Sequence, residues 1–206
     1  LYDDNIYSFD IETTSCFIKK DGSIMMFDSE KDPVFYDNVE RVGFMYIWQF
    51  SINDSVYYGR TWDEFTEFLT ALRHNIQGTM IIYVHNLSFE FQFLRNVIKD
   101  FTIFARKSRH VIVARSDQYN VEFRCSYMLT QSKLADLPSM YDLPVQKMSG
   151  DLDYNVFRNS QTVLTDQELT YCEHDCLVVY FLIKKFRTRY DHVCSIPLTQ
   201  TGTLRR

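Results

Sequence analysis

The sequence predicts an α/β or α+β domain in which helices flank a mixed sheet. Short stretches rich in aromatic and β-branched residues alternate in polarity like strands, and segments with apolar residues at helical spacing lie between them. The 206 residues are 46% hydrophobic and 16% aromatic, which is enough for a sizeable core. We therefore expect one compact domain.

The first half of the chain predicts four strands and two helices. Residues 5–13 alternate between a polar and an apolar side, and the polar residues 15–38 break this pattern. Two strands joined by a turn at "SIND" follow within residues 41–60. Thr61 and Glu64 have the spacing of a capping box, which predicts a helix to about Asn75. "TMIIYVHN" predicts a buried strand, followed by a helix from Asn86 or Leu87.

The second half predicts a hairpin, a strand and a long helix. Residues 101–116 form the hairpin, with its turn at Lys107 to Arg109, and residues 121–126 form the strand. Prolines and a glycine between residues 129 and 158 indicate irregular structure with short helices. A helix is predicted from Thr165 to Arg189, because its first turn is acidic and its last turn basic, as the helix dipole favours.

Composition limits the classes of partner and compartment. The net charge of -5 gives no global attraction to a polyanion, so nucleic-acid binding would need local basic patches or metal ions. Five cysteines without a CxxC pattern indicate a reducing compartment, and we expect a cytoplasmic protein. No apolar run approaches the about 20 residues that span a bilayer, so we expect no membrane partner. The chain starts without methionine and ends at "TGTLRR", and we expect it to be a piece of a longer protein.

Asp10 and Glu12 lie two residues apart on the first predicted strand, so both side chains point to the same side of the sheet. Two like charges this close need a cation or a proton between them. A D-x-E pattern is short enough to occur by chance, and two hydrated carboxylates at the end of a strand are the alternative. The pair alone therefore does not decide between a site and a surface.

Two predicted helices also carry a carboxylate on an apolar face. Asp175 lies in the apolar stripe of the last helix, one turn after Tyr171, and Glu90 shares a face with Leu87 and Leu94. An unpaired buried carboxylate costs several kcal/mol unless it is protonated, hydrogen-bonded or bound to metal. The alternatives are an aspartate that caps an amide or pairs with arginine, and a glutamate at the edge of its apolar stripe.

A shared divalent-metal site explains all three acidic segments together. Oxygen ligands without a histidine cluster favour Mg²⁺ or Mn²⁺ over zinc. Cys172, His174 and Cys176 do not form a zinc site, because a helix turns His174 roughly 200° away from Cys172. We interpret these three residues as packing and surface positions.

Three motifs then occur in a recognisable order: "FDIET", "YVHNLSFEFQFL" and "YCEHD". They resemble the D-x-E, H-N-x-x-F-D and Y-x-x-x-D motifs in the 3′-to-5′ exonuclease domain of family B DNA polymerases, specifically the protein-primed polymerases of small tailed phages. "FRCSYMLTQSKLADLP" and "SGDLDY" resemble further segments of this family. The resemblance runs over residues 6–183, and the combination is far more specific than any single motif.

The resemblance implies a ribonuclease H-like α/β fold with a mixed sheet of five to six strands flanked by helices. It implies that residues 1–190 are the exonuclease domain and that residues 191–206 begin a linker to a polymerase domain. The implied partners are a single-stranded DNA 3′ end, a nucleotide monophosphate product, the C-terminal polymerase domain and a terminal protein primer. The implied location is the cytoplasm of a bacterial host.

By motif position, the resemblance also implies a set of catalytic residues, namely Asp10, Glu12, Glu90, Tyr171 and Asp175. The four carboxylates would hold two divalent cations, Mg²⁺ or Mn²⁺, at the last phosphodiester of a frayed 3′ end. One cation would acidify a water and the other would stabilise the departing 3′ oxygen. Tyr171 would orient the water by hydrogen bonding.

The same resemblance implies five DNA-binding residues, namely Thr13, Asn86, Phe89, Ser126 and Tyr154. Single strands need stacking platforms and backbone contacts more than base-edge contacts. Each residue has an ordinary alternative: Asn86 as a helix N-cap, Phe89 as core, and Tyr154 as a loop aromatic. The basic hairpin turn is either a phosphate contact or a solvated surface, and it comprises Arg106, Lys107, Arg109 and His110.

Two positions depart from the family pattern. Glu90 stands where the family has aspartate and is one methylene longer, and Mg²⁺ tolerates little error in its octahedral geometry. We expect Glu90 still to serve the metal site, with activity lowered or shifted toward Mn²⁺. Ser149 stands where relatives have a lysine before the G-D-x-D-Y motif, and Lys147 is close enough in sequence to substitute.

The leading hypothesis is therefore a metal-dependent proofreading exonuclease domain that edits 3′ ends for a replicative phage polymerase. A second hypothesis is a catalytically weakened module that binds and guides single-stranded DNA for a polymerase, with Glu90 as the mark of a decayed site. A third is a stand-alone nuclease of the same superfamily that acts on RNA or DNA.

Overall fold

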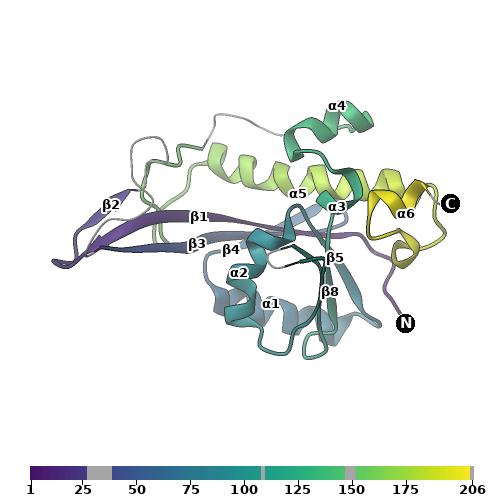
Figure 1. Cartoon of the computed structure of the whole chain (residues 1–206), viewed down its shortest axis with the longest axis horizontal. Coiled ribbons are helices and arrows are strands. Elements are labelled where there is room, and N and C mark those ends of the chain that lie inside the picture. Colours follow the sequence, from purple (N-terminus) through teal and green to yellow (C-terminus); the bar gives the residue numbers. More distant parts are fainter. Residues whose placement is uncertain (27–38, 108–109, 147–151, 205–206) are drawn as a thin grey trace.

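A central sheet with helices on both faces forms the body of the molecule (Figure 1). The structure, a computed structural model, describes residues 1–26, 39–107, 110–146 and 152–204. The long helix α5 (Asp166–Arg187) lies along one face of the sheet, and α1 (Trp62–Asn75) and α2 (Leu87–Val97) lie on the other. This arrangement of layers confirms the α/β class predicted from the sequence.

The sheet contains eight strands within the described ranges, in the order β4-β3-β1-β5-β8-β7-β6, with β2 paired to β1 outside this path. The pairs β1–β5 and β5–β8 are parallel, and the remaining pairs are antiparallel. The strands are β1 (Tyr7–Lys19), β2 (Ile24–Met26), β3 (Val39–Ile52), β4 (Ser55–Gly59), β5 (Met80–Val84), β6 (Thr102–Ala105), β7 (Val111–Ser116) and β8 (Val121–Cys125).

The central strand β1 has two different neighbours. It pairs with β3 along its whole length, but with β5 only through Tyr7 and Ser8. Because Ser8 lies beside Tyr83, β5 ends at Val84 close to the position of Asp10 along β1, and α2 begins shortly after it. The N-terminus of α2 is therefore brought next to the carboxylates of β1.

Both long helices that flank the sheet begin with a capping box. At α1, the Thr61 hydroxyl accepts from the Glu64 amide at 3.2 Å, and the Glu64 carboxylate accepts from the Thr61 amide at 2.9 Å. At α5, Thr165 and Glu168 make the same pair of bonds at 3.2 and 2.8 Å. The short helices are α3 (Tyr127–Thr130), η1 (Leu134–Asp136), α4 (Leu137–Tyr141), η2 (Val193–Ser195) and α6 (Gln200–Leu204).

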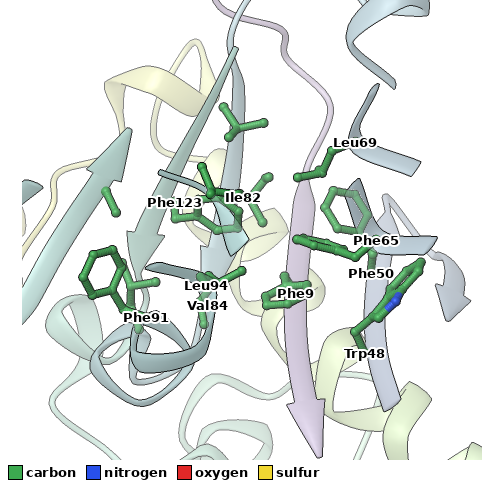
Figure 2. Close-up of a cluster of buried hydrophobic side chains, with 14 of the residues drawn as sticks. Phe9, Trp48, Phe50, Phe65, Leu69, Ile82, Val84, Phe91, Leu94 and Phe123 are labelled. Atoms are coloured by element: carbon green, nitrogen blue, oxygen red, sulfur yellow. The ribbon is translucent and has the colours of Figure 1, made fainter. Parts of the chain in front are cut away.

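A separate hydrophobic core lies on each face of the sheet. On the face covered by α1 and α2, Phe9 of β1 packs against Phe65 of α1 with 4.8 Å between ring centroids, and Trp48 of β3 packs against Phe65 at 5.4 Å (Figure 2). On the other face, α5 packs its apolar stripe against the sheet together with α4 and η2. The alternation of β1 thus places its apolar residues toward α1 and α2 and its polar residues toward α5.

The sheet is larger than the five to six strands predicted. The prediction that the first strand covers residues 5–13 and ends before the polar residues 15–38 is wrong, because β1 continues to Lys19 and β2 returns along it. This extension pairs with β3, so β1 and β3 form a long ribbon with β2 alongside (Figure 1). Polar side chains do not prevent such pairing, since its hydrogen bonds come from the backbone. Residues 27–38 lie outside the described part of the chain.

Within the described residues, the other predicted elements are confirmed to within a few residues at their ends; residues 108–109 of the predicted hairpin turn and residues 147–151 lie outside that part of the chain. The "SIND" turn joins β3 to β4, with Asn53 at a positive φ of 54°. The predicted domain boundary at residue 190 stays a prediction. Beyond that residue, Val193 and Ile196 are buried in the core on the α5 face. None of the helices within the described ranges has both the length and the apolar character needed to cross a membrane.

Candidate metal and nucleic-acid site

The polar face of β1 presents its carboxylates to α5. Ser8 fixes this orientation, because its hydroxyl donates to the carbonyl oxygen of Cys176 in α5 at 2.9 Å. Asp10 and Glu12 follow on the same face at two-residue spacing. Glu12 is buried and Asp10 is half-buried, so these two side chains are not simply a hydrated pair at the end of a strand.

A β-bulge lies directly after Glu12. Glu12 pairs with Ile47 of β3, whereas the next residue, Thr13, pairs with Met45, so Tyr46 has no partner in the register. A bulge of this kind bends the strand and re-aims the side chains beside it. The extra residue belongs to β3, so the bulge changes which residues of β3 lie beside Glu12 and Thr13.

Asp175 completes a cluster of three carboxylates. It lies on the buried side of α5 and is 5% exposed. One carboxylate oxygen from each of Asp10, Glu12 and Asp175 lies within 4.8 Å of the other two. Three carboxylates at this separation repel one another strongly unless a cation or protons neutralise them.

Glu90 lies beside this cluster. It occupies the first turn of α2, is 4% exposed, and its Oε2 atom is buried without a hydrogen-bond partner among the described residues. Burial, and then the charge of Asp10, raise the pKa of Glu90 well above its ordinary value. Glu90 lies outside the 4.8 Å cluster. The expectation that Glu90 faces inward is confirmed, and its part in a metal site stays a prediction.

The four carboxylates fit a divalent cation by their chemistry. Three clustered carboxylates and a buried, unsatisfied oxygen on Glu90 offer the hard oxygen donors that Mg²⁺ and Mn²⁺ prefer. Asp10, Glu12 and Asp175 would hold such an ion, with Glu90 beside them. When bound, the ion would neutralise the cluster and acidify a water molecule.

Cys172, His174 and Cys176 of α5 lie in different surroundings. Cys172 and Cys176 are buried, and burial raises the pKa of both thiols. His174 points elsewhere, since its Nδ1 lies 3.0 Å from the Gln146 carbonyl oxygen.

Two tyrosines meet next to the cluster. Tyr171 lies one turn before Asp175 and is buried, and its hydroxyl is 3.1 Å from the hydroxyl of Tyr154. The Tyr154 side chain is 58% exposed overall, whereas Tyr171 is 5% exposed. Burial of its hydroxyl, and then the charge of Glu12, raise the pKa of Tyr154, which therefore stays protonated at neutral pH.

Asn86 and Phe89 lie at the start of α2 and are exposed. Asn86 occupies the N-cap position in a left-handed conformation, with φ 66° and ψ 51°, and its side chain makes no capping bond. The alternative that Asn86 serves only as an N-cap therefore lacks its defining hydrogen bond. Phe89 is 39% exposed and packs against Phe93 at 5.5 Å, so it is not an ordinary core residue.

Thr13 and Ser126 are less accessible than Asn86 and Phe89, whereas the basic residues near the β6–β7 turn are exposed. Thr13 is half-buried beside the bulge. Ser126 is fully buried, and its hydroxyl lies 3.1 Å from Nδ1 of His85, so it does not present its hydroxyl at the surface. Arg106, Lys107 and His110 are exposed near the β6–β7 turn. Arg109, Lys147 and Ser149 lie outside the described residues.

Two buried polar residues near the cluster were not predicted from the sequence. Gln49 of β3 pairs directly with Asp10, is 1% exposed, and its amide has no hydrogen-bond partner among the described residues. The sequence feature that could have predicted the burial of Gln49 is its position as a polar residue within the apolar stretch "YIWQFSI". Arg158 is also buried, at 6% exposed. It lies in a segment without periodicity, so no pattern predicted its burial.

Comparisons with known proteins give a structural likeness. No protein-family model matches the chain, and no curated protein matches it in sequence. Among solved structures, an orthorhombic crystal form of phi29 DNA polymerase matches with a TM-score of 0.69 and 13% identity, over 98% of this chain and 34% of that one.

Two complexes of phi29 DNA polymerase match in the same way. The complex with primer-template DNA and incoming nucleotide substrates has a TM-score of 0.65 and 13% identity, over 93% of this chain and 32% of that one. The complex with single-stranded DNA has a TM-score of 0.61 and 14% identity, over 92% of this chain and 32% of that one. This chain has a ribonuclease H-like fold shared with part of phi29 DNA polymerase. It spans about a third of the length of that polymerase, and the likeness agrees with the resemblance seen in the three motifs.

Proposed function

We propose that this chain is a metal-dependent 3′-to-5′ exonuclease domain that hydrolyses the terminal phosphodiester of single-stranded DNA. The observation that carries the proposal is the meeting of Asp10, Glu12 and Asp175 within 4.8 Å, with the buried Glu90 beside them. These residues come from three distant segments, and a structural role does not require such repulsion in one place. A site for divalent cations gives the cluster a chemical purpose.

The side chains around the cluster have separate tasks in this proposal. The carboxylates would hold Mg²⁺ or Mn²⁺, and the hydroxyls of Tyr154 and Tyr171 would orient the attacking water or a phosphate oxygen by hydrogen bonding. Asn86 and Phe89, exposed at the start of α2, contact the last nucleotides of the strand, with Phe89 as a stacking surface. The product is a nucleoside monophosphate. Thr13 and Ser126 support this surface from partly or fully buried positions.

The proposal extends to a longer protein. The chain matches about a third of phi29 DNA polymerase, so we propose that residues 1–190 edit 3′ ends for a polymerase domain in the same polypeptide and that residues 191–206 lead toward it. A terminal protein that primes synthesis would be a further partner, by resemblance to the protein-primed polymerases.

The buried Glu90 favours one second candidate. Because Glu90 lies outside the 4.8 Å cluster, the chain is a candidate for a module that binds single-stranded DNA and has lost much of its catalytic rate. In that case DNA binding is retained while hydrolysis is weak with every divalent cation.

Degradation of a 5′-labelled single-stranded oligonucleotide tests the proposal. With Mn²⁺ or Mg²⁺ we expect a ladder of products that shorten from the 3′ end, and no ladder with EDTA. The Asp10→Ala and Glu12→Ala double mutant should lose the ladder and should melt in EDTA at or above the temperature of the parent. Equal rates for the double mutant and the parent chain would contradict the assignment of the site.

Binding and substrate controls separate the candidates. Fluorescence anisotropy with the same oligonucleotide in Ca²⁺ measures binding without hydrolysis. Binding without any ladder would favour the weakened module. An RNA oligonucleotide of the same sequence that is degraded as fast as DNA would favour a nuclease outside replication.

A further inference from the structure

Arg158 is the last residue of the loop that carries Tyr154, and its side chain bonds back to the backbone of that loop. We call residues 152–158 the Tyr154 loop. The Arg158 guanidinium donates from Nη1 to the carbonyl oxygens of Asp153 at 2.6 Å and Val156 at 3.3 Å. These two carbonyl groups lie on either side of Tyr154 in the sequence. The guanidinium therefore fixes the backbone both before and after the tyrosine.

The same guanidinium anchors the loop to α5. Its Nε and Nη2 atoms donate to Oε1 of Glu168 at 2.9 and 2.6 Å, and both side chains are largely buried. Glu168 is held in turn by the capping box at Thr165. The anchor thus lies at a rigid helix terminus, one turn before Tyr171.

The backbone of Arg158 anchors the loop to β1. The Thr14 hydroxyl donates to the Arg158 carbonyl oxygen at 2.6 Å and accepts from its amide at 3.2 Å. Thr14 lies two residues after Glu12. Arg158 is therefore bonded to both elements that carry the acidic cluster, namely β1 and α5.

An arginine is needed for this arrangement. A buried ion pair is weak support for stability, because well-packed apolar residues often replace it without loss. The planar guanidinium, however, presents donors in fixed directions, so it can bind one carboxylate and two carbonyl groups at once. A lysine ammonium at this position has no such fork.

We propose that Arg158 is a positioning residue, which holds the Tyr154 hydroxyl against Tyr171 and so sets the pair of tyrosines next to the acidic cluster. This inference rests on the proposed function, since its consequence for rate requires hydrolysis at the cluster. Its geometric part does not depend on that activity.

A double-mutant cycle tests the consequence for rate. Arg158→Lys should lower kcat for the oligonucleotide by about tenfold, and Tyr154→Phe should lower it by a similar factor. If Arg158 acts through Tyr154, adding Arg158→Lys to Tyr154→Phe should cause little further loss. Arg187→Lys is the matched control, because Arg187 pairs with Asp4 away from the cluster and should leave kcat unchanged.

Two further measurements separate positioning from a general loss of structure. Arg158→Lys should keep its Mn²⁺ affinity by calorimetry, because the bonds that define the role of Arg158 run to Glu168, to Thr14 and to two carbonyl groups of the loop. Thr14→Val removes only the hydroxyl that bonds the Arg158 backbone. This variant should also lower kcat, as Arg158→Lys does. If the losses from Arg158→Lys and Tyr154→Phe multiply in full, the inference is overturned.

A spectroscopic readout tests the geometry without activity. With 3-fluorotyrosine placed at position 154, the ¹⁹F resonance should shift or broaden in the Arg158→Lys protein and stay unchanged in the Arg187→Lys protein. An unchanged resonance in the Arg158→Lys protein would overturn the inference even if the chain hydrolyses DNA. Absence of hydrolysis in the parent chain would instead count against the proposed function.

Discussion

Glu90 is the residue whose environment is least suited to its charge. It is buried beside Asp10 and Glu12, and its raised pKa means that the folded protein keeps a proton which the unfolded chain has already released. Folding therefore takes up a proton, and the free energy of unfolding falls as pH rises above the ordinary range of a glutamate, up to the folded-state pKa. Below that ordinary range, Glu90 is protonated in both the folded and the unfolded state, so it does not change the free energy of unfolding with pH.

Glu90→Gln should therefore raise the melting temperature without metal, by an amount that grows as the pH rises above the ordinary range of a glutamate. For a domain of this size, each kcal/mol corresponds to roughly 2–4 °C. Thermal melts in EDTA at several pH values measure the difference between the variant and the parent. Groups with lowered pKa, such as Asp4 and Glu168, contribute equally to both proteins and cancel. A difference that is constant with pH would argue against a protonated Glu90.

The extra methylene of Glu90 leads to a second prediction. Glu90→Asp restores the residue found in the resembling family, and it should keep the Mg²⁺-dependent rate within about threefold or raise it. Rates on a 5′-labelled oligonucleotide in Mg²⁺ and in Mn²⁺ measure this. Glu90→Gln, with the same length and no charge, is the control and should be slower in both. A large loss in Glu90→Asp would mean that the site has adapted to glutamate.

The backbone of Asn86 allows its two possible roles to be separated. The left-handed conformation costs most residues about 1–2 kcal/mol, but not glycine. Asn86→Gly should therefore keep the stability of the parent within about 1 kcal/mol and weaken binding of single-stranded DNA. Asn86→Ala should weaken binding and also destabilise the chain. Denaturant unfolding and anisotropy measure the two effects, and unchanged binding in both variants would leave Asn86 a purely structural role.

At the scale of elements, the sequence predicted correctly those features that depend only on residues close together in the chain. The capping residues Thr61 and Glu64 predicted the start of α1 correctly, because a capping box needs only neighbouring residues. The alternation of β1 correctly placed Asp10 and Glu12 on one face. The bulge after Glu12 was not predicted, because it depends on which residue of β3 lies opposite, and the sequence of β1 does not contain that information.

The two capping boxes make a matched pair for a test. Thr61→Ala and Thr165→Ala should each destabilise the chain by about 1 kcal/mol, because each removes the hydroxyl that caps its helix. Only Thr165→Ala should also lower the rate of DNA hydrolysis, since Thr165 steadies the Glu168 that binds Arg158. Urea unfolding and oligonucleotide assays measure these effects. Equal rates in the two variants would mean that the start of α5 does not influence the site.

At the scale of the whole molecule, the residues of the site were easier to predict than its geometry. Glu90 and Asp175 could be identified as unusual because each carboxylate lies on the apolar face of a predicted helix. The order of the three motifs then linked them to Asp10 and Glu12. The distances among them follow from the register of eight strands and from the direction of α5 across the sheet. These are long-range properties, so neither the enclosed cluster nor the burial of Gln49 and Arg158 could be read from any one segment.

The enclosed cluster predicts that metal binding stabilises the whole fold. Without a cation, folding brings Asp10, Glu12 and Asp175 together at a cost in repulsion that the unfolded chain does not have. A cation that binds only the folded state adds about 2.7 kcal/mol when its concentration is 100 times the dissociation constant. Mn²⁺ should therefore raise the melting temperature of the parent chain by several degrees compared with EDTA at equal ionic strength.

The variants decide whether this stabilisation comes from the cluster. The Asp10→Ala and Glu12→Ala double mutant should melt at or above the temperature of the parent in EDTA and should lose most of the gain from Mn²⁺. A Glu67→Ala and Glu173→Ala double mutant removes the same charge from exposed positions, including one on α5, and should keep the full gain. If both double mutants respond to Mn²⁺ as the parent does, the ion acts on the general acidic surface. If only the first loses its response, the ion binds where β1 and α5 bring their carboxylates together.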